Sequence, residues 1–185
     1  MKKTAIILVI IVFLCGCSAE KGVDQAINLR QRIVNADNCL FTCKITADYL
    51  DAVYNFTLDC RFDRTGNMTF TVSAPNSIAG ISGSFTNQGA SLTFDDQELA
   101  FEMMADGYIS PISSPWIMMK ALRGGYIRSC GKDGEGLRIT IDDSFAEQPL
   151  QLDVWTDELG TPVHCEILWQ GRRILTLDVN LLRYM

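Results

Sequence analysis

The chain has 185 residues, of which 16 are lysine or arginine and 22 are aspartate or glutamate, so its formal net charge is −6 at pH 7. This length is typical of one domain with a sizeable core. The acidic balance argues against a nucleic-acid partner and against electrostatic adhesion to anionic lipid headgroups.

The N-terminus has the pattern of a bacterial lipoprotein signal. Residues 1–3 are a basic start, and the ten residues from Ala5 to Leu14 carry no charge. This run is too short to span a bilayer, so residues 1–16 are interpreted as an export signal peptide. The segment Leu14-Cys15-Gly16-Cys17 resembles a lipobox, in which a peptidase cuts after a small residue and the next cysteine carries the lipid.

Cys17 is the expected site of lipid attachment. Gly16 before Cys17 is small, whereas Leu14 before Cys15 is not. An ordinary cleaved signal with two incidental cysteines is the alternative. Two or three acyl chains such as palmitate, at about 0.8 kcal/mol per buried methylene, would hold the protein on the extracytoplasmic face of the cell membrane without spanning it. Cleavage would also remove two lysines, leaving 14 basic against 22 acidic residues and a net charge of −8.

The mature chain is predicted to begin with a tether, residues 17–22, followed by a single domain, residues 23–185. The first element of this domain is expected at residues 23–36. Apolar side chains recur there at helical spacing, which predicts an amphipathic helix whose apolar stripe needs a partner. These side chains are Ala26, Leu29, Ile33 and Ala36.

A meander of antiparallel strands follows. Between residues 41 and 74, apolar and polar side chains alternate in three successive runs that are broken by short turn segments. A period of two indicates strands with one apolar and one polar face. In this half of the chain, strands are expected over residues 41–49, 54–62, 68–74, 78–85, 90–94 and 99–104.

A second helix is predicted in the middle of the chain. Ser114 is its expected N-cap, Pro115 its first helical residue, and Gly124-Gly125 its end. Since only Lys120 and Arg123 are charged, this helix must be buried against a large apolar surface, for which the concave face of the sheet is the candidate. Strands resume over residues 126–130, 137–141, 150–154, 163–169 and 173–181, which makes about eleven in all.

This order of elements behind a lipobox resembles the lipoprotein-carrier superfamily of LolA, LolB and LppX. Residues 111–115 and 169–173 are also similar to small lipoproteins of Gram-positive anaerobes. The resemblance implies an α+β fold, an unclosed antiparallel half-barrel whose concave face is covered by the two helices. It also implies that acyl chains of lipoproteins, or other lipids, bind on that face.

Five cysteines follow Cys17, and an odd number outside the cytoplasm leaves at least one unpaired. If the turn between the first two strands pairs Leu50 with Val53, Cys43 falls opposite Cys60, within reach of a cross-strand disulfide. The alternative is that all five are small buried hydrophobic side chains.

The sequence offers little catalytic chemistry. His164 is the only histidine, and it is expected to face solvent beside Glu166. A histidine-containing metal cluster or a Ser-His-Asp relay therefore has at most one possible centre. The motifs GxSxG, GxGxxG and HExxH and the P-loop are all missing from the sequence. We expect no catalytic residue, metal or cofactor.

Two functions fit this pattern. The first is a membrane-anchored lipoprotein that binds a lipid or other hydrophobic ligand between the sheet and the inserted helix, where methionine suits flexible chains. The second is a non-catalytic protein-interaction or sensor module of the cell envelope, with a filled core and a polar face or edge strand that meets an envelope protein. The candidate ligand residues are Phe94, Phe101, Met103, Trp116, Met118, Met119 and Leu122.

Overall fold

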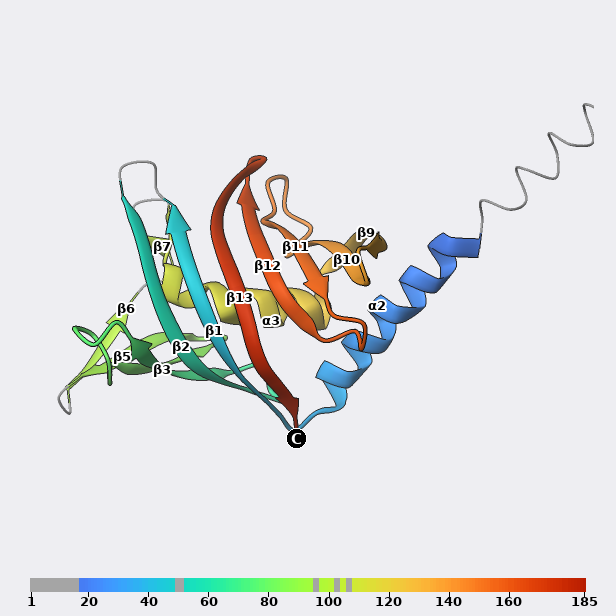
Figure 1. Ribbon diagram of the computed structural model, residues 1–185. Coiled ribbons are helices and arrows are strands. Elements are labelled where there is room, and N and C mark those ends of the chain that lie inside the picture. Colours follow the sequence, from blue (N-terminus) through green and yellow to red (C-terminus); the bar gives the residue numbers. More distant parts are fainter. Residues whose placement is uncertain (1–16, 49–51, 95–96, 102–103, 106–107) are drawn as a thin grey trace, which may run out of the picture.

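The computed structural model describes residues 17–48, 52–94, 97–101, 104–105 and 108–185 (Figure 1). Helix α2 (Cys17–Asn35) comes first, and the 3-10 turn η1 (Pro111–Ser113) and helix α3 (Ser114–Gly124) interrupt the strands. The strands are β1 (Asn38–Asp48), β2 (Val53–Asp63), β3 (Met68–Ala74), β4 (Ser82–Thr86), β5 (Gly89–Phe94), β6 (Gln97–Phe101), β7 (Met104–Ala105), β8 (Tyr108–Ile109), β9 (Tyr126–Asp133), β10 (Gly136–Asp142), β11 (Gln151–Thr156), β12 (Pro162–Trp169) and β13 (Arg172–Tyr184).

Within the described residues, eleven strands form one antiparallel sheet in the order β6-β5-β4-β3-β2-β1-β13-β12-β11-β10-β9. The first and last strands pair at its centre, and each half of the chain runs outward from them as a meander. The sheet is not closed, because β6 and β9 stand at opposite ends of this order. The predicted unclosed half-barrel is confirmed. A separate hairpin of β7 and β8 was not expected from the sequence.

The two faces of the sheet follow the alternation in the sequence. In β1, Cys39, Phe41, Cys43, Ile45 and Ala47 are all buried on one side, which we call the inner face. The residues between them point to the opposite, outer face and are partly or fully exposed. The period of two thus predicts correctly which side chains enter the core.

The predicted register between β1 and β2 is wrong by two residues. Asp48, and not Leu50, is the residue that pairs with Val53. The connection between the strands is therefore longer than a two-residue turn; its residues 49–51 lie outside the described part of the chain. A shift of two keeps every side chain on its face. It places Cys43 opposite Leu58 and Cys60 opposite Phe41, and both cysteines are free thiols.

The starts of both helices also differ from prediction. Helix α2 begins at Cys17, so the expected tether 17–22 forms its first turns; this stretch contains alanine, glutamate and lysine, which favour helix. Ser114 is not an N-cap. The turn η1 runs directly into α3, and the Ser114 hydroxyl donates a hydrogen bond to the carbonyl of Pro111 at 2.6 Å.

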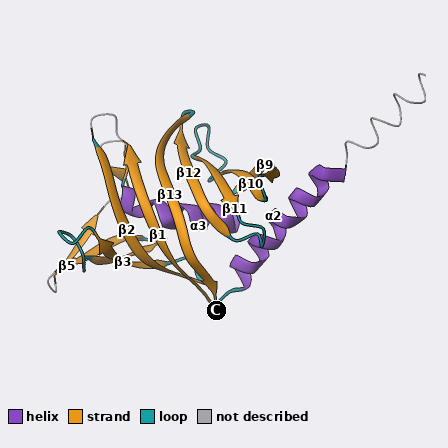
Figure 2. Cartoon of the chain, in the orientation of Figure 1, coloured by secondary structure: helices purple, strands orange, loops and turns teal. Residues whose placement is uncertain are grey.

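Helix α3 lies across the inner face of the sheet, behind β1, β13 and β12 in the view of Figure 1 and Figure 2. Its location under the sheet is as predicted. Helix α2 packs beside it, against β9. Arg30 of α2 ties the two helices together, because its guanidinium donates to the carbonyls of Leu122 at 2.9 Å and Gly125 at 2.7 Å. None of the described helices is long and apolar enough to cross a lipid bilayer.

Gly125, directly after α3, is required by close packing. A Cβ atom there would lie 2.7 Å from the carbonyl oxygen of Asp142 and 2.6 Å from Cγ2 of Ile141. At Gly124 the same atom would meet nothing within 4 Å. The two adjacent glycines therefore have different tolerance for a side chain.

We predict that Gly125→Ala lowers the free energy of unfolding by about 1–3 kcal/mol, the usual cost of overpacking. Gly124→Ala is the matched control and should leave it unchanged or raise it slightly, since alanine favours helix. Urea unfolding of both variants measures the difference. Equal midpoints for the two variants would show that α3 does not dock on β10 as described.

Candidate functional site

The four described side chains among the predicted ligand residues are all buried in the core. Trp116 is 5% exposed and Leu122 2%, while Met118 and Met119 are 0% exposed. An exposure of zero leaves no room for a water molecule beside these methionines. In this part of the chain, these four side chains of α3 are packed in the core and do not border an open cavity.

Trp116 illustrates how tightly this region is packed. Its indole nitrogen donates to the carbonyl of Gly66 at 2.9 Å, and its ring stacks on Phe85 with centroids 5.8 Å apart. The Lys120 ammonium lies 4.3 Å from the ring centroid. Phe94 lies in β5 and Phe101 in β6, and only the backbone of these two residues is described; Met103 lies outside the described residues.

The inner face also carries four buried thiols. Burial raises the pKa of Cys39 to about 11, against a weaker opposing effect of Arg123, and it raises the pKa of Cys43, Cys60 and Cys165 as well. A raised pKa keeps a thiol protonated and poorly nucleophilic. These four cysteines are small apolar core residues, whereas the fifth, Cys130, is only partly buried.

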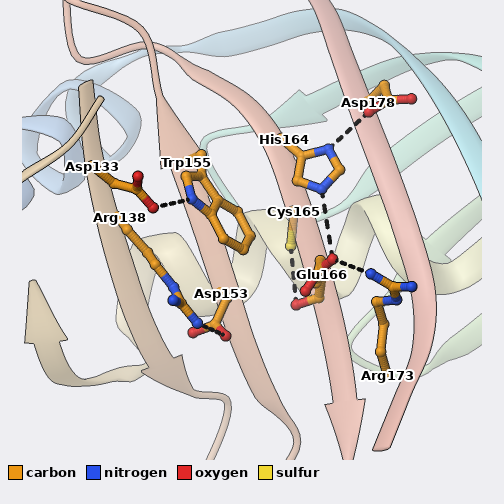
Figure 3. Close-up of polar contacts among 9 residues, drawn as sticks. All are labelled: Asp133, Arg138, Asp153, Trp155, His164, Cys165, Glu166, Arg173 and Asp178. Carbon is orange, nitrogen blue, oxygen red and sulfur yellow. Dashed lines mark hydrogen bonds and ion pairs between the residues drawn. The ribbon is translucent and has the colours of Figure 1, made fainter. Parts of the chain in front are cut away.

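The outer face of β10–β13 holds a connected polar network (Figure 3). Asp153 is a buried carboxylate that accepts hydrogen bonds from Arg138 and from the hydroxyl of Thr140, both at 2.7 Å. The Arg138 guanidinium also lies over the ring of Trp155, 5.0 Å from its centroid. The indole nitrogen of Trp155 donates to Asp133 at 2.8 Å. Paired and hydrogen-bonded in this way, a buried carboxylate is tolerated.

His164 lies on the outer face, beside Glu166 as predicted, and a second carboxylate, that of Asp178, lies on its other side. Its Nδ1 is 2.8 Å from Asp178 and its Nε2 is 4.0 Å from Glu166, which also contacts Arg173 at 2.6 Å. Within the described part of the chain, no hydroxyl or thiol is hydrogen-bonded to the imidazole. Nor does any group of three or more histidine, cysteine or acidic residues there have the arrangement of a metal site. The contacts of His164 are those of a surface ion-pair network.

A hollow of about 750 Å³ lies on the outer face of the other half of the sheet. Figure 1 shows β3 and β5 running across the view while β1 and β13 run up it, so the sheet bends sharply between them. The hollow lies over these strands and their neighbours. We call it the outer groove, and its lining includes side chains from β13, β1, β2, β3, β4 and β5.

Two cross-strand rows form the floor of the outer groove. The register of the six strands places the members of each row directly opposite one another. The first row is Arg183, Leu40, Arg61, Thr69, Ser84 and Ser91, and the second is Thr42, Asp59, Thr71, Ser82 and Thr93. The floor therefore combines many hydroxyl groups with two guanidinium groups and one carboxylate.

A β-bulge shapes one end of the groove. Leu40 pairs with Arg183 and Thr42 with Asn180, so β13 has one extra residue here. Leu181 in the bulge has a φ of 56° and is 70% exposed. A leucine rarely adopts this left-handed conformation, and bulges commonly redirect side chains beside functional sites. The bulge turns an apolar side chain outward at the rim of the groove.

The sequence did not identify this groove. The alternation predicts that Arg61 and the threonines face outward, but it does not predict which strands become neighbours. Arg61 and Arg183 share a row only because the first and last strands of the sheet pair. A positive φ at Leu181 has no signal in a sequence without glycine or asparagine at that position.

Comparison with known proteins gives similarity in structure only. No protein-family model and no curated protein matches the chain. It is similar to a LolA superfamily protein from Nitrosomonas europaea, with a TM-score of 0.46, 9% identity, and coverage of 92% of this chain and 94% of that one. For lipoprotein LppX of Mycobacterium tuberculosis, the TM-score is 0.41 and the identity 12%, with coverage of 88% of this chain and 93% of that one. For the structure of the CwlD amidase in complex with the GerS lipoprotein from Clostridioides difficile, the TM-score is 0.48 and the identity 11%, with coverage of 85% of this chain and 92% of that one. At such identities the likeness describes the path of the chain and not its ligands.

We predict that a thiol reagent at pH 8 modifies Cys130 first in the native protein lacking residues 1–17, because Cys130 is the partly exposed one of the five free cysteines. At pH 8 the thiol of Cys39 stays protonated, because the pH is about three units below its pKa of about 11. The other three thiols are buried, with exposed fractions of 5% or less. Cys130→Ser should remove the early reaction, and denaturation should release the remaining thiols. Rapid modification of the Cys130→Ser protein would contradict the described burial. Fewer thiols than expected after denaturation would reveal a disulfide.

Proposed function

We propose that the protein is a lipid-anchored, non-catalytic binding module of the cell envelope that recognises a partner protein with the outer face of its sheet while its core stays filled. One contrast carries this proposal. Met118 and Met119 of α3 are fully buried on the inner face, whereas the outer face of the same sheet is hollowed by about 750 Å³. Clefts of this size, with a few well-placed polar groups, are typical binding sites.

Non-catalytic recognition is consistent with the polar groups of the outer face. The carboxylates of the network are paired with Arg138, Arg173 and His164. This pairing fixes the positions of the carboxylates and, among the described residues, places beside them no group that would activate a substrate. The lipid anchor is supported by Gly16-Cys17 and by the uncharged run before it. Residue 17 also opens α2, so an acyl chain on Cys17 would place the base of α2 at the membrane surface.

A second candidate function is binding of a lipid or other hydrophobic ligand between the sheet and α3. Met118 and Met119 favour it, because unbranched thioether side chains can repack around an acyl chain. This function requires α3 to move away from the sheet, since the indole of Trp116 is hydrogen-bonded to Gly66 and both methionines are fully buried. It therefore depends on a conformational change that the first function does not need.

We predict that Cys17→Ala moves the protein from the membrane fraction to the soluble fraction and abolishes its labelling by palmitate. Without the diacylglyceryl group on the Cys17 sulfur and its acyl chains, an acidic protein has no other strong attraction to anionic lipid. Cys15→Ala is the matched control and should stay membrane-bound and labelled, because Gly16-Cys17 remains intact. Retention of the Cys17→Ala protein on the membrane, or release of the Cys15→Ala protein, would contradict the assigned anchor.

A further inference from the structure

We infer that the outer groove binds an extended acidic peptide segment of the partner, an inference that rests on the proposed function and names its site and ligand chemistry. The groove crosses six strands. Five spacings of about 4.8 Å give it a length of about 24 Å, which matches roughly seven residues of extended chain at about 3.4 Å each. The hydroxyl groups along its floor can donate to and accept from peptide groups.

Charge complementarity indicates an acidic ligand. The whole chain has a net charge of −6, yet Arg61 and Arg183 stand on the groove floor without a carboxylate partner among the described residues. Within the described ranges, Arg61 donates only through Nε, to the side-chain oxygen of Asn38 at 2.8 Å. The carboxylate of Asp59 accepts from the hydroxyl of Thr42 at 2.8 Å. The guanidinium nitrogens are therefore available for carboxylates of another chain.

The spacing of the two arginines suits alternate side chains of an extended peptide. Both flank Leu40 in the same row, so their backbones are two strand spacings, or about 10 Å, apart. Side chains at positions i and i+2 of an extended segment point the same way and are about 7 Å apart. Arginine side chains are long enough to make up the difference between these two spacings. Leu181 at the rim offers an apolar contact beside them.

Two other anionic or polar ligands fit less well. Arg61 and Arg183 are both exposed, but a membrane surface is flat and would not follow a hollow that crosses six strands. Sugars are commonly held against an aromatic ring, but the two aromatic residues of the lining, Phe41 and Phe70, are turned into the core and are 4% and 3% exposed. A peptide needs neither a flat surface nor an aromatic platform.

The experiment uses the protein without residues 1–17 and a fluorescein-labelled nine-residue peptide with glutamate at alternate positions. Fluorescence anisotropy should show binding that weakens with salt, and none for the same peptide with glutamine in place of glutamate. Arg61→Ala and Arg183→Ala should each weaken binding by roughly 10- to 100-fold. Arg64→Ala is the matched control. It removes the same charge next to β2, where Arg64 pairs with Asp37 outside the groove, and it should bind like the wild type.

Several results would overturn the inference. These are equal binding of both peptides, unchanged affinity in Arg61→Ala and Arg183→Ala, or no binding of the glutamate peptide by a protein with normal unfolding. Binding of vesicles of phosphatidylglycerol and phosphatidylcholine that depends on these arginines, with no peptide binding, would assign the groove to lipid headgroups instead. A negative result in the peptide experiment would leave the filled core and the anchor intact. Recovery of lipid from the interior would instead overturn the proposed function, whether or not the peptide binds.

Discussion

The burial of α3 is the constraint on which the structure depends. This helix is apolar on nearly every side, so it is stable only when it is surrounded, and the eleven-stranded sheet bends around it. Burying one such side chain contributes about 1.5–3 kcal/mol. Arg30 completes the arrangement from α2 by satisfying carbonyls at the end of α3 that would otherwise lack donors. The filled inner face and the curved outer face are two results of the same packing.

In the proposed function, recognition takes place on the outside of the sheet because α3 covers the inside. A half-barrel can hold a ligand on its concave face only where its covering helix leaves space, and Met118 and Met119 of this helix are fully buried. The outer face instead combines a rigid ion-pair network over β10–β13 with a groove over β13 and β1–β5. Hydrogen bonds fix the first region, whereas the arginines of the second have donors to spare. A binding surface of this kind is held in place by regular strands and does not rely on loops.

The sequence predicts local features of this structure and misses those that depend on geometry at a distance. Alternation over residues 41–74 identifies three strands and their buried faces, and the lack of charge around Trp116 identifies the covering helix, because both patterns are periodic. The register of β1 and β2 depends on the length of their connection, so the facing of Cys43 and Cys60 was wrong. The groove was missed because it requires pairing of the first and last strands, a sharp bend and a bulge, none of which has a periodic signal.

The most direct test of a filled core with an outward-facing site is extraction of the protein that lacks residues 1–17. After purification without detergent and extraction with organic solvent, mass spectrometry should find no stoichiometric lipid, and the protein should not bind a fluorescent fatty acid. Recovery of about one lipid per chain, or saturable fatty-acid binding that Met118→Ala or Met119→Ala alters, would show that α3 covers a ligand site and would contradict this account.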